Sequence, residues 1–302
     1  FENVWESKFI NITNQAELIN ILMQEDYDII FGKLGINFSE KVLSLLIGKK
    51  ILVTPTTGHD HIDLRAIEKY GVCLLSLRDE IDFLQEITST AEHAWSLLLA
   101  GSRKINSLIS RTKSKSWVRD DLNIAQISGK NIGIIGYGRL GKIISEYAEA
   151  FRMNIFFVDP NVDNPSNMKV KKTSLVNLLK ISDYIVLSAS YLPGDPPILA
   201  EEEFKYIKKG AGLVNIARGE LIDESALLKS FNKGNLSFIA LDVLSGDSSW
   251  GKNKMLESEI IDQSATNDGI IITPHVGGYS KEAIFKTREF MLSKLKKYIN
   301  FE

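Results

Sequence analysis

Three segments of the chain carry side chains suited to binding and protonating a small acid, and each follows a short apolar run. Arg218 could grip a carboxylate through two parallel hydrogen bonds, because its guanidinium is planar and permanently charged. His275 could give and take a proton near neutral pH. Asp242 lies in the segment between them, with Asp247 five residues later. Taken singly, such an arginine is more often a surface ion-pair partner and such a histidine is more often structural, so the interpretation rests on their joint order.

A glycine pattern precedes these segments. Gly136, Gly138 and Gly141 fit G-x-G-x-x-G, with the apolar run Asn131–Ile135 before them and the helical pattern Leu140–Phe151 after them. The first glycine allows a tight turn, the second allows the backbone to approach a pyrophosphate, and the third allows helix and strand to pack closely. The helix N-terminus offers free N–H groups to the phosphates. The alternative is a glycine turn in some other α/β fold, but the flanking strand and helix favour a dinucleotide site.

Asp159 indicates which dinucleotide to expect. It directly follows the next apolar run, Asn154–Val158. A carboxylate at that point can accept hydrogen bonds from the ribose hydroxyls, and it would repel a 2′-phosphate. The sequence therefore predicts NAD rather than NADP as the cofactor.

These residues need a scaffold that places strand ends together, and the chain twice alternates apolar runs with helical patterns. The first series has strands at Tyr27–Phe31, Lys50–Val53 and Val72–Leu75, with helices around Ala16–Met23, Glu40–Leu46 and Leu64–Lys69. A long helix, Thr88–Ala100, and a polar stretch up to Ser128 come next. The second series has strands at Asn131–Ile135, Asn154–Val158, Tyr184–Leu187, Leu213–Asn215, Phe238–Leu241 and Ile270–Ile272, with helices at Leu140–Phe151, Leu175–Ile181, Glu202–Ile207 and Glu224–Phe231. We expect an α/β fold with two Rossmann-like or flavodoxin-like parallel-sheet domains and an interdomain cleft, where ligands sit at the carboxyl ends of the strands.

Composition narrows the function classes. The 302 residues are 44% hydrophobic and 25% charged, and the net charge of -2 argues against nucleic acid as the main partner. No apolar run is long enough to span a membrane. The single cysteine, Cys73, cannot form an internal disulfide, so a reducing compartment, the cytoplasm, is expected. The chain begins at Phe1 without an initiator methionine, so we also expect a few residues upstream that could form a first strand.

The motifs between about Lys50 and Lys286, taken in this order, resemble those of the D-isomer-specific 2-hydroxyacid dehydrogenase family, which includes glycerate, phosphoglycerate and D-lactate dehydrogenases. The resemblance implies that Arg218 binds the substrate carboxylate and polarises the keto oxygen, and that His275 is the general acid for reduction. Backbone N–H groups of Thr57 and Gly58 would hold the same carboxylate. The residues implied to border the cofactor are Gly136, Gly138 and Gly141, with Arg139 and Leu140 at the pyrophosphate, Asp159 at the ribose, Asp242 near the nicotinamide amide, and Ile216, Ala217, Gly277 and Gly278.

The resemblance also implies the domain organisation and the assembly. The C-terminal helix of this family completes the first domain, so residues 1–98 with 280–302 are expected to bind the substrate. Residues 99–279 are expected to form the NAD-binding domain. Members are commonly dimers, and a homodimer is expected.

The chain departs from the family at one catalytic position. A glutamate normally follows the L-D-V segment and orients the histidine, whereas Asp247, one methylene shorter, takes that place here. We predict a direct or one-water contact between Asp247 and His275 in the closed, cofactor-bound form, with Gly246 permitting the closer loop path. The carboxylate-binding loop also has Thr56 where glycine is usual, and the proline-rich stretch Ser188–Leu199 differs from the family's usual sequence.

Three alternatives stay open. His59, Asp60, His61 and Asp63 could suggest a metal site, but no partner from another segment is evident, and a loop capped by Asp63 before a helix explains them better. A second alternative is a module of the same fold that senses NAD(H) with little or no turnover.

The third alternative concerns the acid itself. Arg78 and His59 leave open whether it is plain, phosphorylated or phosphonate-bearing.

Overall fold

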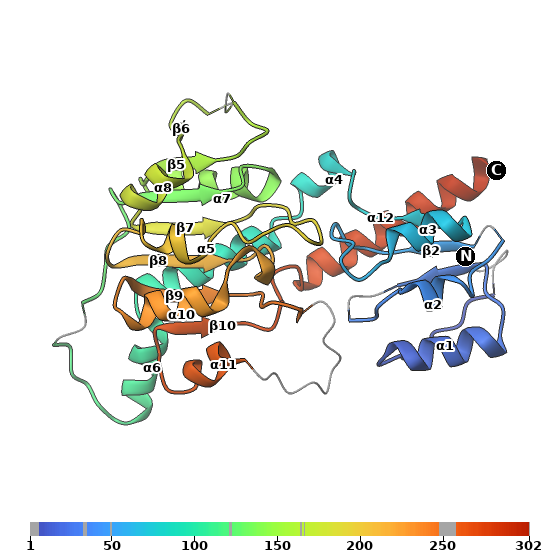
Figure 1. Cartoon of the computed structure of the whole chain (residues 1–302), viewed down its shortest axis with the longest axis horizontal. Helices are drawn as coiled ribbons and strands as arrows, with labels where there is room; N and C mark the ends of the chain where they lie inside the picture. The colour runs from blue at the N-terminus through green and yellow to red at the C-terminus, as the bar shows by residue number, and fades with distance from the viewer. Residues whose placement is uncertain are drawn as a thin grey trace. The chain divides into compact units, whose positions relative to one another are not determined.

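The computed structural model describes residues 6–32, 35–48, 50–120, 123–163, 165, 167–247 and 258–301. They form two compact units, one comprising described residues between 6 and 80 with 285–301 and the other described residues between 81 and 247 with 258–284 (Figure 1). The units thus change over at Glu80 and Ile284, whereas the sequence places the boundaries at 98 and 279. The difference arises because helix α5 (Ser89–Ser102) packs on elements of the second unit, namely α7 (Arg139–Ala150), β8 (Ala211–Asn215) and β9 (Leu236–Leu241).

The first unit contains a parallel sheet with the order β1-β2-β3. Its elements are β1 (Ile29–Phe31), β2 (Ile51–Val53), β3 (Cys73–Leu75), α1 (Gln15–Gln24), α2 (Glu40–Leu43) and α3 (Leu64–Tyr70). The core between sheet and helices is aliphatic and includes Leu18, Val42, Leu43 and Leu52. The C-terminal helix α12 (Lys281–Phe301) returns to this unit, where Lys294 pairs with Glu80 at 2.6 Å.

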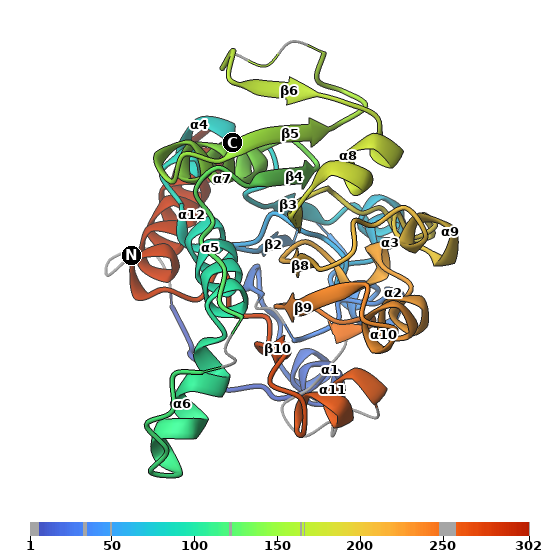
Figure 2. The same cartoon turned by 90° about the vertical axis from the view of Figure 1, so that its left-hand side faces the viewer.

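The second unit is a doubly wound parallel sheet with the order β10-β9-β8-β7-β4-β5-β6 (Figure 2). Its strands are β4 (Asn131–Ile135), β5 (Asn154–Val158), β6 (Val170–Lys172), β7 (Tyr184–Leu187), β8 (Ala211–Asn215), β9 (Leu236–Leu241) and β10 (Ile270–Ile272). The first strand of this sheet in sequence is β4. Strands β5 and β6 lie on one side of it and β7 to β10 on the other, so the strand order reverses between β4 and β7. Such a switch point is where open α/β sheets bind their ligands.

Helices cover both faces of this sheet (Figure 2). On one face lie α5 and α7 (Arg139–Ala150), and on the other lie α8 (Leu175–Ile181) and α10 (Glu224–Asn232). Because successive strand residues point to opposite faces and both faces are covered, the central strands β7 and β8 are buried along their whole length. Shorter helical segments are α4 (Ile81–Gln85), α6 (Ile105–Lys113), α9 (Glu201–Phe204), η1 (Gly219–Leu221) and α11 (Glu259–Ser264).

The predicted strands are all present within two residues of their expected ends, and β6, α4, α6 and α11 are additional. Strand β6 escaped prediction because it is an edge strand whose last two residues, Lys171 and Lys172, are exposed. Helix α6 lies in the stretch predicted to be polar, for which no helix was predicted, and none of its residues is buried. Among the described residues, no helix combines the length and apolar character needed to cross a membrane.

Candidate active site

The glycine loop lies at the switch point of the second sheet. Gly136 follows β4 with φ of +90°, and a Cβ there would lie 2.4 Å from the Cα of Ala189, which follows β7. A Cβ on Gly141 would lie 2.3 Å from the carbonyl oxygen of Gly136, so the first turn of helix α7 packs closely on the glycine loop. Gly138, in contrast, faces open space, with nothing within 4 Å of its Cβ position. The loop thus has the tight turn, the close helix and the unobstructed backbone that a bound pyrophosphate requires.

Arg139 begins helix α7 and is largely withdrawn from solvent. Its Nη1 donates to the carbonyl oxygens of Leu84 and Ile87, at 3.0 and 2.7 Å, and burial lowers the pKa of the guanidinium. Neither carbonyl carries a formal charge, so a pyrophosphate nearby would supply the compensating negative charge. Leu140, expected beside the same group, is partly buried against the core.

Asp159 stands at the end of β5 as predicted and ties that strand to the glycine loop. Its Oδ2 accepts a hydrogen bond from the backbone N–H of Tyr137 at 2.7 Å, and its Oδ1 accepts one from Asn161 at 2.8 Å. Each carboxylate oxygen can accept more than one hydrogen bond, so these contacts leave capacity for ribose hydroxyls.

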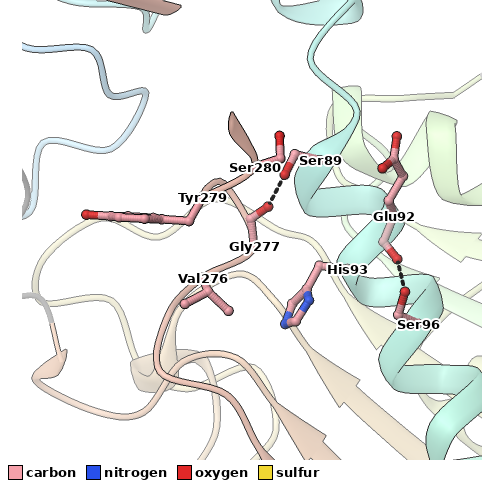
Figure 3. A pocket seen from close by; sticks show the side chains of 8 residues that line it. All are labelled: Ser89, Glu92, His93, Ser96, Val276, Gly277, Tyr279 and Ser280. Carbon is pink, nitrogen blue, oxygen red and sulfur yellow. Dashed lines mark hydrogen bonds between the residues drawn. The ribbon is translucent and has the colours of Figure 1, made fainter. Parts of the chain in front are cut away.

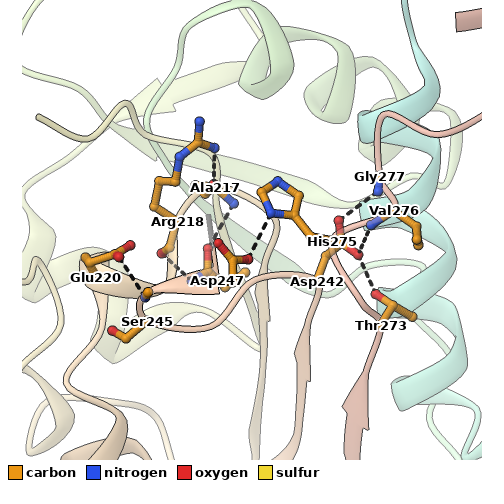
Figure 4. Close-up of polar contacts among 12 residues, drawn as sticks. Ala217, Arg218, Glu220, Asp242, Ser245, Asp247, Thr273, His275, Val276 and Gly277 are labelled. Carbon is orange, nitrogen blue, oxygen red and sulfur yellow. Dashed lines mark hydrogen bonds and ion pairs between the residues drawn. The ribbon is translucent and has the colours of Figure 1, made fainter. Parts of the chain in front are cut away.

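Arg218 follows β8, and the backbone around it is fixed by the buried Asn215. The Asn215 amide donates to the carbonyl of Arg218 at 2.8 Å and accepts from the N–H of Ala217 at 3.0 Å. Ile216 and Ala217 are buried, while Arg218 itself is partly exposed and donates from Nη1 to the carbonyl of Ala217 at 2.7 Å (Figure 4).

His275 and Asp247 are in direct contact, as the sequence predicts. Nδ1 of His275 lies 2.9 Å from Oδ2 of Asp247 (Figure 4). The Asp247 side chain is only 6% exposed, and within the described residues its buried Oδ2 has no hydrogen bond of good geometry, so the 2.9 Å approach of Nδ1 is an ion-pair contact. Gly246 has φ of +75°, so the loop takes the glycine-permitted path that the shorter side chain needs. The contact leaves Nε2 as the ring nitrogen available for proton exchange.

Asp242 anchors the loop that carries His275. Its carboxylate, 2% exposed, accepts from the Thr273 hydroxyl at 2.6 Å and from the N–H groups of Val276 and Gly277 at 2.9 and 2.8 Å. Burial opposes ionisation of this carboxyl, but its hydrogen bonds outweigh burial, so its pKa lies below the ordinary value. His275 adopts φ of +53°, a conformation that costs a residue with a side chain about 1–2 kcal/mol. The bonds to Asp242 hold the loop in that conformation.

His93 completes this network and was not given a role from the sequence. Its Nε2 lies 2.8 Å from Oγ1 of Thr273 and 3.2 Å from Oδ1 of Asp242. Because the Thr273 hydroxyl donates to Asp242, the Nε2 of His93 must be the donor in its own contacts. The residue lies on α5, far from the other two in sequence, so only the fold reveals the connection.

A shallow cavity of about 440 Å³ lies between α5 and the loop after His275 (Figure 3). Its lining residues are Ser89, Glu92, His93, Ser96, Val276, Gly277, Tyr279 and Ser280. The Ser89 hydroxyl donates to the carbonyl of Gly277 at 2.6 Å and so ties the loop after His275 to helix α5. Gly278, the next residue, is exposed.

The expected carboxylate-binding loop lies in the first unit, after β2. Thr56 occupies the position where the family usually has glycine, and its hydroxyl donates to the carbonyl of Gly58 at 2.9 Å. Its Oγ1 also lies 2.9 Å from that of Thr54, so the threonine braces the turn that presents Thr57 and Gly58. Asp63 caps helix α3 by accepting from the N–H of Ala66 at 3.0 Å, as predicted. Within the described ranges, no group of three or more His, Cys, Asp or Glu side chains is arranged to hold a metal ion.

Comparison with known proteins gives this geometry its context. Residues 95–277, more than half of the chain, match the family described as D-isomer specific 2-hydroxyacid dehydrogenase, NAD binding domain. The chain belongs to this family. The glyoxylate reductase of Thermococcus gammatolerans is 30% identical over 251 residues, which are 80% of this chain and 70% of that protein. The crystal structure of D-lactate dehydrogenase from Aquifex aeolicus, complexed with NAD and lactic acid, has a TM-score of 0.83 and 26% identity over 95% of this chain and 87% of that chain.

Family membership confirms the predicted fold class and the NAD cofactor, and it identifies the chain as an NAD-dependent oxidoreductase of the 2-hydroxyacid dehydrogenase type. The D-3-phosphoglycerate dehydrogenase of Methanocaldococcus jannaschii is 29% identical over the whole chain, but the chain spans only 55% of that protein's length.

Proposed function

We propose that the chain transfers a hydride between the nicotinamide ring of NAD(H) and C2 of a small D-2-hydroxy acid or 2-keto acid. The observation that carries the proposal is the 2.9 Å contact between His275 and Asp247, on loops that follow the neighbouring strands β10 and β9. Arg218 follows the next strand, β8. The carboxyl ends of three adjacent parallel strands thus supply a cation, an acid–base group and a carboxylate that supports it.

Each side chain has a defined task in this proposal. Arg218 binds the substrate carboxylate and polarises the keto oxygen, because a guanidinium stabilises the negative charge that develops there. The N–H groups of Thr57 and Gly58 hold the same carboxylate. His275 delivers a proton from Nε2 to the oxygen on C2 during reduction and removes it during oxidation. Asp247 accepts the Nδ1 hydrogen bond, fixes the orientation of the ring and stabilises the imidazolium.

Bound NADH would supply the hydride, and the glycine loop, Arg139 and Asp159 would hold its phosphates and ribose. Asp242 has four donors from the protein on its two oxygens, only one of them on Oδ2. That oxygen retains capacity for the nicotinamide amide. Ile216, Ala217, Leu140 and Gly278 would complete the border of the cofactor.

The test follows NADH absorbance with a panel of plain and phosphate-bearing 2-keto acids, including glyoxylate and pyruvate. Turnover with at least one acid is expected, and Arg218→Lys should raise the KM for that acid at least tenfold, because a lysine cannot form the paired hydrogen bonds. Tight NADH binding without turnover of any acid would favour the sensing module instead.

The proposal extends to assembly and compartment. Several large apolar side chains on α6 and just after it are exposed, namely Ile105, Ile109, Trp117 and Val118. Exposed apolar side chains grouped on one segment are typical of an interface, which supports a homodimer and is tested by light scattering on the purified protein. The single cysteine, Cys73, supports a reducing compartment, the cytoplasm.

A further inference from the structure

The loop that delivers Asp247 lies directly against the turn that follows Arg218. A Cβ on Gly219 would lie 2.0 Å from the carbonyl carbon of Leu244 and 2.1 Å from the nitrogen of Ser245. Only glycine permits this approach, since real Cβ atoms do not come so close to backbone. The segments carrying Arg218 and Asp247 are therefore packed backbone against backbone.

Two glutamates next to that glycine receive successive N–H groups of the loop. The backbone nitrogen of Ser245 donates to Oε1 of Glu224 at 2.7 Å, and that of Gly246 donates to Oε1 of Glu220 at 2.9 Å. The nitrogen of Asp247 itself bonds within the loop, to the carbonyl of Leu244 at 3.1 Å. Hydrogen bonds to a carboxylate are shorter and roughly twice as strong as those between neutral groups. The three consecutive N–H groups of Ser245, Gly246 and the catalytic Asp247 are thus all engaged.

This arrangement gathers negative charge, which costs energy. Burial raises the pKa of Glu224, and the nearby carboxylates of Glu220 and Asp247 raise it further. Glu220 and Glu224 nevertheless both accept hydrogen bonds from this loop. Their placement on the two N–H groups immediately before Asp247 indicates what they hold.

We propose that Glu220 and Glu224 are positioning residues that place Asp247 on His275. The inference rests on the proposed function of Asp247. Because aspartate is one methylene shorter than the family's glutamate, its carboxylate reaches the imidazole only from a loop drawn close to it. By accepting hydrogen bonds from Ser245 and Gly246, the glutamates hold the loop in the conformation that brings Asp247 close to His275.

The experiment compares Glu220→Ala and Glu224→Ala with Glu220→Gln and Glu224→Gln. Glutamine keeps an oxygen acceptor for the N–H group but removes the charge. Each alanine variant is expected to lower kcat/KM for keto-acid reduction roughly tenfold, with NADH affinity unchanged, and to move the alkaline fall-off of the pH profile to lower pH. Each glutamine variant should have a kcat/KM and a pH profile close to those of the wild type. Glu203→Ala is the matched control, since it also removes a carboxylate bond to a backbone N–H, that of Ala200, but on helix α9.

A second readout does not depend on turnover. The chain has only 4 histidines, so the titration of His275 can be followed by NMR with labelled histidine and assigned with His275→Gln. Its midpoint should fall in the alanine variants and stay in place in the control. In an Asp247→Asn background, Glu224→Ala should have little further effect, because the two residues act on one contact.

Alanine variants that fold, as judged by thermal melting, and keep the wild-type titration of His275 would overturn the proposal. Glutamine variants that lose as much as alanine would also overturn it, since a kept acceptor should hold the loop. If alanine prevents folding, Glu220→Asp and Glu224→Asp take its place, and they should show the same shifts because they withdraw the acceptor by one methylene. A wild-type protein that turns over no keto acid but shows the NMR shifts would refute the proposed function and leave the positioning role intact.

Discussion

Replacing Asp247 with asparagine isolates the charge at the contact with His275. Asparagine has nearly the same shape, and its amide oxygen can still accept the hydrogen bond from Nδ1. The ring should therefore keep its orientation, while the imidazolium loses its negative partner at 2.9 Å. Since keto-acid reduction needs the protonated ring, the variant should lose activity most where the ring is least protonated, at neutral and higher pH.

The magnitude follows from burial and distance. Two unit charges 4 Å apart interact by about 4 kcal/mol at an effective dielectric constant of 20, and this pair is closer. The His275 side chain is 32% exposed, however, so solvent screens part of that attraction. A net value of about 1.5–3 kcal/mol, typical of a hydrogen bond to a charged group, is more realistic. It corresponds to a loss of roughly 10- to 140-fold in kcat/KM, at about 1.4 kcal/mol for each factor of ten.

The assay is the pH dependence of kcat/KM for reduction, measured from pH 5 to 10 with the best keto acid. The alkaline fall-off should move to lower pH in Asp247→Asn, and the loss should shrink at the acidic end, where the ring is protonated in both proteins. Asp247→Glu should be milder if the loop relaxes to accept the longer side chain. An Asp247→Asn enzyme with the wild-type profile would show that Asp247 does not support the imidazolium and that His275 acts with Arg218 alone.

Three further outcomes follow from the geometry. Gly138→Ala should leave the melting temperature unchanged but weaken NADH binding at least tenfold, whereas Gly136→Ala should also lower the melting temperature, because its Cβ would collide with backbone at φ of +90°. Asp159→Ser should narrow the preference for NADH over NADPH measured by kcat/KM, since it removes the charge that repels the 2′-phosphate; equal use of both cofactors by the wild type would contradict this. His93→Leu should destabilise the fold by about 1–3 kcal/mol in denaturant unfolding, because it removes the N–H donor to Thr273 and Asp242, and His93→Gln should restore part of the loss.

The sequence by itself determined the order of the chemistry and the scaffold beneath it. Gly136, Gly138 and Gly141 identify a dinucleotide loop because each position has a local steric requirement that neighbouring residues reveal. Asp159 directly follows an apolar strand and His275 comes three residues after one, so both could be predicted at the edge where parallel strands bring their carboxyl ends together. Asp63 could be predicted as a helix cap because capping is also a local contact, made with the N–H group three residues ahead.

Only the tertiary structure decided how the catalytic loops are held. The bond from His93 to Thr273 joins residues 180 positions apart, and those from Ser245 to Glu224 and from Gly246 to Glu220 cross between two strand ends. No local pattern marks these partners, because a histidine on a helix and glutamates after an arginine are ordinary surface residues in sequence. Their roles arise from loop paths, and a loop path depends on which backbone groups the packed strands leave unsatisfied.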